Sequence, residues 1–372
     1  MLSSFRVVLL SLLVACSGSS EPKPTPSAPA EPPKPTAVKV GVITILSGEN
    51  ADYGTYTRNG IELAMKEHPT KAVEIVYEDS KADAQEALRV FKDLQAAGTP
   101  VVIGPFTSTE VRQVGPAAQS AGVVLVTSSA TADDLSSVGD HLFMMLPPNS
   151  KQGSDQATYA STKLGAKRAA ILWRENPYGT TLHDSFKKTF EAAGGTVVAD
   201  KPFPEGTEEF KDYLKALAKE KPDVVFIPTH DGDTGRILAQ ARAVKFPPTK
   251  FLGADGSMTS TMLDLAKEAA EGSIYSNVAS IDPAFDEAYR SAYGKDASPY
   301  AASAYDTVNV LVALAEKGAR SADDFERGLV GLSGHAGATG PTRFTLVDKS
   351  YWCMDKVYRQ FEVVGGAFKL QP

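Results

Sequence analysis

The chain has 372 residues, 45 acidic against 38 basic side chains and a formal net charge of -7, which argues against a nucleic-acid-binding protein. It contains only two cysteines, Cys16 and Cys353, and if Cys16 is modified, as argued below, a disulfide framework and a cysteine-based metal site are both excluded. A body of this length exceeds the size at which a single hydrophobic core usually stops growing, which predicts two lobes.

The N-terminal residues 1–15 are typical of a signal peptide. Arg6 precedes an apolar run over residues 7–15 that is too short to span a bilayer as a helix. The run ends in Ala15-Cys16, which resembles the lipobox of bacterial lipoproteins. The resemblance implies cleavage before Cys16 and lipidation of that residue. Since Ser17 rather than Asp follows the cysteine, it also favours the outer membrane of a Gram-negative cell envelope.

Residues 16–37 are rich in proline and serine, a composition that forms neither helix nor sheet and predicts an extended tether. A tether behind a lipidated cysteine would hold the body away from a membrane. Cys353 would then have no partner within the chain, and we expect it to be a buried, inert thiol.

Short β-branched runs recur along the body and are bounded by turn residues. They are nearly continuous rather than alternating, as in parallel strands that are covered on both faces. Amphipathic segments lie between them, for example around Phe210–Ala218 and Val308–Ala315. The alternation predicts an α/β fold with parallel sheets. The predicted strands are Val38–Thr44, Val73–Tyr77, Val101–Gly104, Val123–Thr127, Arg168–Trp173, Thr196–Ala199, Val224–Pro228 and Phe251–Gly253.

The alternation occurs twice with matching details. In each half the first strand leads to a loop that ends in Tyr-Gly-Thr, at residues 53–55 and 178–180, before a helix. The third strands end in polar turns at residues 107–109 and 229–231, and the fourth strands do so at 128–131 and 254–257. This internal similarity predicts two equivalent lobes that face each other.

Ligands of open parallel sheets bind beyond the carboxyl ends of the strands, where these turns lie. The first half offers hydroxyl groups and helix starts, which suit a carboxylate. Thr107 with Glu110 and Thr131 with Asp134 each have the spacing of a capping box. Thr107 is therefore expected only to cap its helix. For Ser108, Ser129 and Thr131, capping and ligand binding both remain open.

The second half offers Asp255 between Gly253 and Gly256. In a closing cleft this carboxylate would need a cationic partner such as a ligand ammonium. The alternative is an Asp-Gly turn with its carboxylate in water. Tyr53, Tyr178 and Tyr300 are candidate walls of the pocket, although each alone is also compatible with ordinary packing. Donors for a carboxylate on one side and an acid on the other together indicate an α-amino acid.

These segments resemble the type I periplasmic binding proteins, specifically the leucine/isoleucine/valine-binding group. The similarity runs from Val38 to beyond Phe344 and is carried by Tyr53-Gly54, Gly104–Ser108, Ser128–Thr131, Tyr178-Gly179 and Phe251–Gly256. It implies two Rossmann-like lobes joined by three crossovers, with residues 38–148 and 279–345 in the first lobe and residues 149–278 and 346–372 in the second. It also implies delivery of a captured solute to an ABC-type permease.

Carried over by position, the resemblance implies that Ser108, Ser129 and Thr131 hold the ligand carboxylate and amine, and that Asp255 binds the amine. Asp255 stands where branched-chain members usually carry Glu, and His230 stands where an aromatic residue is common. Both departures weaken the case for an aliphatic ligand. The complete implied ligand-binding set is Tyr53, Ser108, Ser129, Thr131, Tyr178, His230, Asp255 and Tyr300.

Other chemistries have little support. The five histidines form no closely spaced pair, and no phosphate-binding or nucleophile motif is present, so we expect no enzyme, metal or cofactor. The glycines around His335 indicate a flexible loop near the hinge. Two alternatives stay open: a sensory role with a receptor partner, and a ligand such as an amide, urea or a short peptide.

Overall fold

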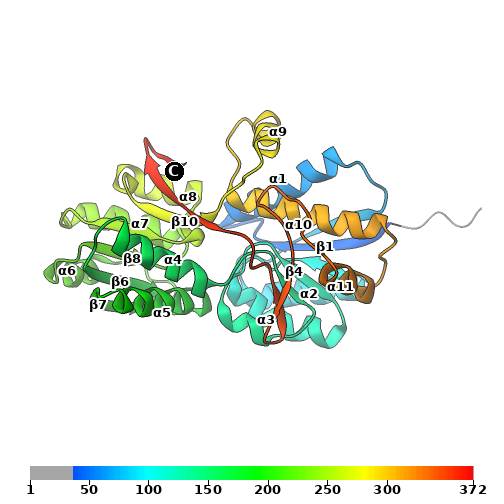
Figure 1. Cartoon of the computed structure of the whole chain (residues 1–372), viewed down its shortest axis with the longest axis horizontal. Helices are drawn as coiled ribbons and strands as arrows, with labels where there is room; N and C mark the ends of the chain where they lie inside the picture. The colour runs from blue at the N-terminus through cyan, green and yellow to red at the C-terminus, as the bar shows by residue number, and fades with distance from the viewer. Residues whose placement is uncertain (1–36, 372) are drawn as a thin grey trace, which may run out of the picture. The chain divides into compact units, whose positions relative to one another are not determined.

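The computed structural model describes residues 37–371, which contain two seven-stranded sheets with helices on both faces (Figure 1). The predicted signal peptide, Cys16 and almost all of the predicted tether lie outside the described residues. Within 37–371, no helix combines the length and the apolar character that a membrane crossing requires. Each sheet with its helices is called a lobe below.

The first lobe has the strand order β11-β12-β5-β4-β3-β1-β2, in which only the pairing of β11 with β12 is antiparallel. Its strands are β1 (Val38–Thr44), β2 (Val73–Asp79), β3 (Val101–Ile103), β4 (Val124–Thr127), β5 (Leu142–Met144), β11 (Thr345–Val347) and β12 (Ser350–Trp352). Its helices are α1 (Ala51–Glu67), α2 (Ala84–Ala96), α3 (Ser108–Ala121), the short η1 (Asp133–Ser137), α9 (Pro283–Tyr293), α10 (Pro299–Glu316) and α11 (Ala322–Val330).

The second lobe has the order β14-β13-β10-β9-β8-β6-β7, with β13 and β14 antiparallel to their neighbours. Its strands are β6 (Arg168–Arg174), β7 (Thr196–Phe203), β8 (Val224–Ile227), β9 (Lys250–Gly253), β10 (Ile274–Val278), β13 (Tyr358–Val364) and β14 (Ala367–Leu370). Its helices are α4 (Asn149–Thr162), α5 (Pro177–Ala192), α6 (Lys211–Lys219), α7 (Asp231–Ala243), α8 (Ser260–Ala266) and the short η2 (Asp255–Ser257) and η3 (Lys267–Ala270).

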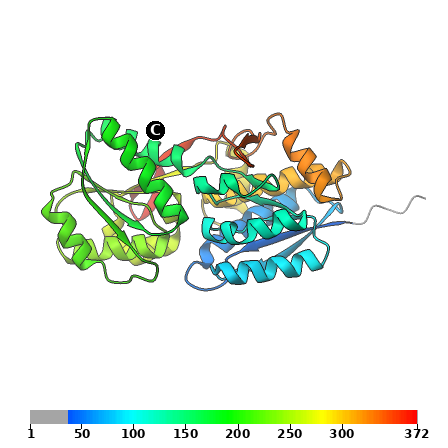
Figure 2. The ribbon, with the colours of Figure 1, turned by 90° about the horizontal axis from the view of Figure 1, so that it is seen from below.

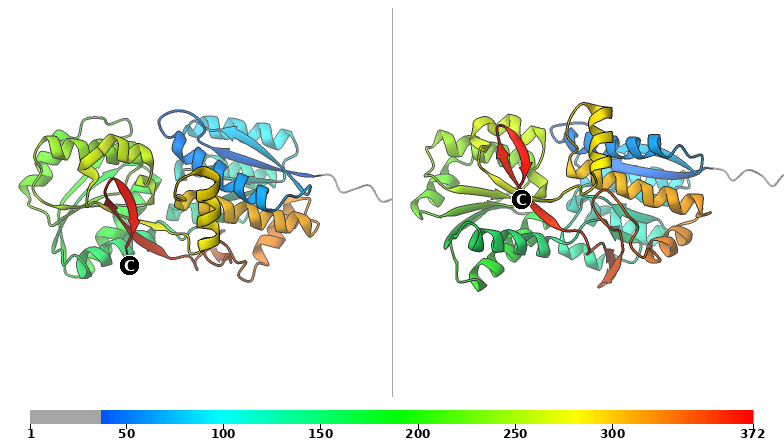
Figure 3. Two further views of the ribbon diagram at one scale, coloured as in Figure 1. Left: turned by 90° about the horizontal axis from the view of Figure 1, so that it is seen from above. Right: turned by 45° about the horizontal axis from the view of Figure 1, so that its top comes forward.

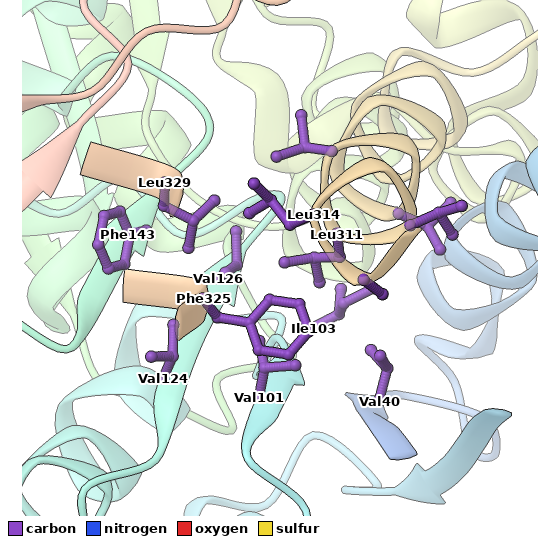
Figure 4. Close-up of a cluster of buried hydrophobic side chains, with 14 of the residues drawn as sticks. Val40, Val101, Ile103, Val124, Val126, Phe143, Leu311, Leu314, Phe325 and Leu329 are labelled. Carbon is purple, nitrogen blue, oxygen red and sulfur yellow. The ribbon is translucent and has the colours of Figure 1, made fainter. Parts of the chain in front are cut away.

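Each sheet is buried on both faces, which explains the continuous apolar strands. In the first lobe one core joins the sheet to α10 and α11, with Leu311 and Phe325 packed over Ile103 and Val126 (Figure 4). The opposite core joins the same sheet to α2 and α3. Two further cores enclose the second sheet between α4 and α5 on one face and α6, α7 and α8 on the other (Figure 2). The predicted α/β class with parallel-dominated sheets is confirmed.

The repeated Tyr-Gly-Thr tripeptides lie in the first turns of α1 and α5, not at the ends of loops as expected. Their glycines explain the repeat. A Cβ on Gly54 would lie 1.9 Å from the carbonyl oxygen of Ile45, and one on Gly179 would lie 2.1 Å from that of Arg174. Both carbonyls stand at or just beyond the end of the preceding strand. Glycine therefore lets the helix start against the strand it follows, in the same way in both lobes.

The chain passes between the lobes three times: from β5 to α4, from β10 to α9 and from β12 to β13 (Figure 3). The third passage differs from the boundary expected after residue 345. Ser350–Trp352 was expected in the second lobe, but this strand pairs with β5 of the first sheet. The chain therefore leaves the first lobe only after Trp352.

A buried ion pair holds this third crossover against α10. The Nζ of Lys356 lies 3.2 Å from the Oδ2 of Asp306, and neither residue is more than 1% exposed. The same carboxylate accepts hydrogen bonds from the backbone N–H groups of Ala338 and Thr339, at 2.5 and 2.9 Å. One acid thus binds the crossover and the glycine-containing loop that follows α11.

Cys353 directly follows β12, at the start of the third crossover. It is fully buried and forms no disulfide within the described residues, so the expected buried thiol is confirmed.

Candidate functional site

The carboxyl edges of the two sheets meet, and tyrosines of the first lobe hydrogen-bond to a turn of the second. Tyr53, in the first turn of α1, donates its hydroxyl to the carbonyl oxygen of Gly256 at 2.5 Å. Tyr300, in the first turn of α10, donates to the carbonyl oxygen of Asp255, also at 2.5 Å. The strand-to-helix turn after β9 is therefore held from across the interface between the lobes.

Asp255 is buried at the centre of these contacts. It is only 2% exposed, and its Oδ1 accepts a hydrogen bond from the Tyr178 hydroxyl at 2.7 Å. Burial raises the pKa of its carboxyl to about 6, although the Tyr178 hydroxyl acts in the opposite direction. Among residues 37–371, no basic side chain forms an ion pair with it. The alternative of a carboxylate in open water is therefore wrong.

Aromatic rings surround this acid. The ring centroids of Tyr53 and Phe106 lie 4.6 Å apart, and Tyr53 meets Tyr300 edge-on at 5.5 Å. Burial raises the pKa of the Tyr53, Tyr178 and Tyr300 hydroxyls above its ordinary value, so they remain neutral hydrogen-bond donors. Sequence reasoning missed Phe106 as a site residue, although its neighbours Thr107 and Ser108 were recognised.

Ser108 and Ser129 order the loop after β4. The Ser108 Oγ accepts the backbone N–H groups of Thr131 and Ala132, at 3.3 and 3.2 Å. The Ser129 hydroxyl donates to the carbonyl oxygen of Phe106 at 2.6 Å. These bonds hold the loop against the start of α3, which positions the polar groups of the first lobe.

The two predicted capping boxes have different outcomes. Thr107 and Glu110 form one at the start of α3, as expected. The box of Thr131 with Asp134 is wrong. Because the backbone of Thr131 is bound to Ser108, the following short helix begins only at Asp133, with Ala132 at its N-cap position. The Thr131 Oγ1 is left buried without a hydrogen-bond partner in the protein. Its hydroxyl is therefore a candidate ligand contact.

His230 occupies the N-cap position of α7, and its ring packs against that of Tyr178 in a tilted arrangement, with ring centroids 4.8 Å apart. Burial and the positive charge of Arg174 lower the pKa of its imidazole to about 3. The ring is therefore neutral. Its Nδ1 is buried and makes no hydrogen bond to another protein atom.

Asp231, the residue after His230, is a second buried acid that sequence reasoning did not select. It is fully buried, and burial raises its pKa to about 6. Its carboxylate accepts hydrogen bonds from Asn50 of the first lobe at 2.7 Å and from Thr259 at 2.8 Å. The only signal in the sequence was its place in the polar turn after β8.

The first turn of α1 also binds the second lobe outside the aromatic cluster. The Oδ2 of Asp52 accepts a hydrogen bond from the backbone N–H of Thr261 at 3.0 Å and from the Ser260 hydroxyl at 2.5 Å. Asp52 thus caps the start of α8 from the opposite lobe. Glu49 pairs with Arg236 of α7, with an N–O distance of 2.5 Å. We call Glu49 and Asp52 with these partners the α1 latch.

A cavity of about 310 Å³ lies beside Tyr53 and His230. Residues of both lobes line it, among them Asn50 and Thr107 from the first and Arg174 from the second. Its size falls within the range of small-molecule sites. Of the eight predicted site residues, Tyr53 and His230 line this cavity. Tyr178, Asp255 and Tyr300 belong to the buried cluster that contacts Tyr53 and His230, whereas Ser108, Ser129 and Thr131 lie at the start of α3 and in the loop bonded to it.

Comparisons with known proteins agree with this architecture. Residues 37–366 match the sequence profile of a family described as periplasmic binding protein. A Leu/Ile/Val-binding protein of Citrobacter freundii is 28% identical over 297 residues, covering 77% of this chain and 80% of its own. The crystal structure of LivJ from Streptococcus pneumoniae, a branched-chain amino acid transporter substrate-binding protein in complex with isoleucine, is 28% identical. It superposes with a TM-score of 0.82 over 91% of this chain and 98% of its own.

A solute-binding protein of an ABC transporter from Rhodopseudomonas palustris (R. palustris), solved with benzoate, shares the fold at 20% identity. Its TM-score is 0.78, over 90% of this chain and 95% of its own.

Proposed function

Because the chain belongs to the periplasmic binding protein family, we propose that it captures an α-amino acid outside the cytoplasm and delivers it to an ABC-type permease. The family consists of substrate-binding proteins rather than enzymes. The identity of the ligand and the partnership with a permease are the parts that we propose.

The buried carboxylate of Asp255 carries the proposal. A buried charge without a counter-ion is costly, and a ligand ammonium group beside it would remove that cost. Tyr178 holds the carboxylate in place through its hydroxyl. Ligand binding would thus supply the cation that the protein itself does not place there.

The first lobe offers the groups for the ligand carboxylate. The start of α3 carries the positive end of a helix dipole, and the Thr131 hydroxyl has no partner in the protein. A ligand with both charges would bind both lobes at once. Closure would then depend on occupancy, since two-sided contacts exist only when the lobes are together.

The relatives support an amino acid without fixing which one. The Citrobacter protein is named for leucine, isoleucine and valine, and the Streptococcus protein was solved with isoleucine. The R. palustris protein with benzoate shows that the same fold also accepts a ligand with no amine. The acid at position 255 is therefore the feature that favours an amino acid here.

Isothermal titration of the full chain with a panel of amino acids, amides and urea tests this function. The Asp255→Asn variant is expected to lose about 2–5 kcal/mol of binding free energy, because it removes one partner of a buried charge pair. Asp264→Asn, which changes an exposed acid of α8, is the matched control and should bind like the wild type. Binding of amides but of no amino acid would contradict the proposal.

We also propose that Cys16 anchors the protein to a membrane through acyl chains. Residues 1–36 lie outside the described structure, so this rests on the sequence alone. Mass spectrometry of the protein from a bacterial host should show an N-terminal Cys16 with added acyl mass. Cys16→Ser should release the protein into the soluble fraction. An unmodified mature N-terminus at another residue would contradict the anchor.

A further inference from the structure

The walls of the cavity beside Tyr53 are mainly polar. Asn50 and Tyr53 line it from the first lobe, and Arg174, Asn176 and His230 line it from the second. Ile45 is the only aliphatic side chain larger than alanine among its lining residues. An aliphatic ligand side chain placed here would separate these polar groups from water without offering them a hydrogen bond, which is unfavourable.

Two of the lining side chains contain a buried hydrogen-bonding atom that is not used within the protein. The Nδ1 of His230 and the Nε of Arg174 are both buried and have no hydrogen-bond partner in the protein. The terminal nitrogens of Arg174 are already engaged, one with Asp233 at 3.3 Å and the other with Glu205. A buried polar atom without a hydrogen-bond partner lowers stability. A ligand group that forms hydrogen bonds with these two atoms would remove that cost.

The charge balance narrows what that partner can be. The guanidinium of Arg174 is already paired with two carboxylates, and Asp83 and Glu205 themselves line the cavity, so the wall has no excess positive charge to attract a ligand carboxylate. The imidazole of His230 is neutral, and its Nδ1 can donate or accept according to its tautomer. A neutral group that both donates and accepts, such as a hydroxyl or a carboxamide, satisfies these atoms. A carboxylate or an alkyl group does not.

We propose that this cleft selects amino acids with a neutral hydrogen-bonding side chain, and that His230 and Arg174 are the residues that recognise it. The inference rests on the proposed function, because it assumes that Asp255 and the first lobe hold the ammonium and carboxylate of the ligand. It identifies a ligand class different from the aliphatic one in the names of the relatives.

Pairs of ligands that match in shape but differ in polarity test the selection. Threonine and valine have nearly the same shape, and so have asparagine and leucine. In titrations of the full-length wild type, the polar member of at least one pair should bind on the order of tenfold tighter or more, because a site built for hydrogen bonds rejects the analogue that lacks them. Equal or tighter binding of valine and leucine would overturn the inference and leave the proposed function intact.

Variants at position 230 test whether His230 causes the preference for polar ligands. His230→Leu should reduce the polar preference to less than about threefold, and His230→Gln, which keeps donor and acceptor atoms, should retain it. His68→Leu, at an exposed histidine of the first lobe, is the matched control and should change nothing. The melting temperature of each variant verifies that it is folded. An unchanged preference in a folded His230→Leu protein would overturn the role of His230.

The two proposals fail in distinguishable ways. If the wild type binds no amino acid at all, both are overturned. If it binds amino acids, loses them all in Asp255→Asn and still prefers the aliphatic member of each pair, only the inference about His230 and Arg174 is overturned.

Discussion

Asp255 shows how a single residue couples binding to pH. Its pKa of about 6 lies above the ordinary value of 3.8, because burial disfavours the charged form. The folded, ligand-free protein therefore binds a proton here more readily than the unfolded chain does. Between about pH 4 and pH 6 this residue contributes stability that is lost as the pH rises. A ligand ammonium group, in contrast, pairs with the ionised form of the Asp255 carboxyl.

Binding should therefore weaken on acidification. If one proton must leave Asp255, affinity for the ligand should fall about tenfold between about pH 7 and pH 5. Titration calorimetry at several pH values measures this. Asp231 also has a pKa near 6, so Asp255→Asn separates the two acids. A wild-type profile as flat as that of the variant would show that Asp255 does not exchange its proton on binding.

Most residues of the candidate site could be selected from the sequence, because polar residues in turns after buried strands are easily recognised. The sequence could not show which hydroxyl groups already form hydrogen bonds within the protein. Ser129 is bonded to a backbone carbonyl, whereas Thr131 is not, and both follow the same strand. Phe106 and Asp231 were missed because an aromatic ring and an acid at a helix start have ordinary structural roles.

At the scale of elements, eight parallel strands were predicted, including β2 and β7 at the sheet edges, whereas the short buried strands β5 and β10 and the four strands after residue 344 were not. Strands such as β3 are covered on both faces and read as continuous apolar runs. The short β11 has all of its residues exposed, and β13 alternates between buried and exposed positions. Neither pattern differs enough from a loop or a surface segment to be recognised. The loop expected before Gly54 was instead a helix start, since its glycine packs against a carbonyl that no local pattern reveals.

Asp52 accepts hydrogen bonds at the start of α8 from the other lobe, and this contact should contribute to ligand affinity. Asp52→Ala should weaken ligand binding by about 1 kcal/mol, because loss of a cap costs about that much and this cap exists only when the lobes are together. Ser321→Ala removes the cap of α11 within one lobe. It should lower the melting temperature while leaving affinity unchanged. Equal affinities of Asp52→Ala and the wild type would show that the α1 latch does not stabilise the bound state.

The whole molecule depends on how three crossovers are fixed, and the pair of Asp306 and Lys356 fixes one of them. Lys356→Met should lower the free energy of unfolding by about 3–5 kcal/mol, because it leaves a buried carboxylate without its cation. Denaturant unfolding measures this. Asp306→Asn combined with Lys356→Met should recover part of the loss.

An exposed pair provides the comparison. Lys187 contacts Asp200 with its side chain 39% exposed, so Lys187→Met should cost less than about 1 kcal/mol. A Lys356→Met protein as stable as Lys187→Met would contradict the role of the buried pair.

Interleaving of the lobes along the chain has a consequence for biosynthesis. The hydrophobic core over the first sheet needs Val40 near its beginning, Leu311 and Phe325 far along the chain, and Cys353 at the last crossing. A polypeptide that emerges N-terminus first cannot complete that core until Cys353 has appeared. The first lobe of a nascent chain should thus remain incompletely folded, and dependent on chaperones, for almost the whole of translation, a condition that also keeps it able to thread through a narrow export channel.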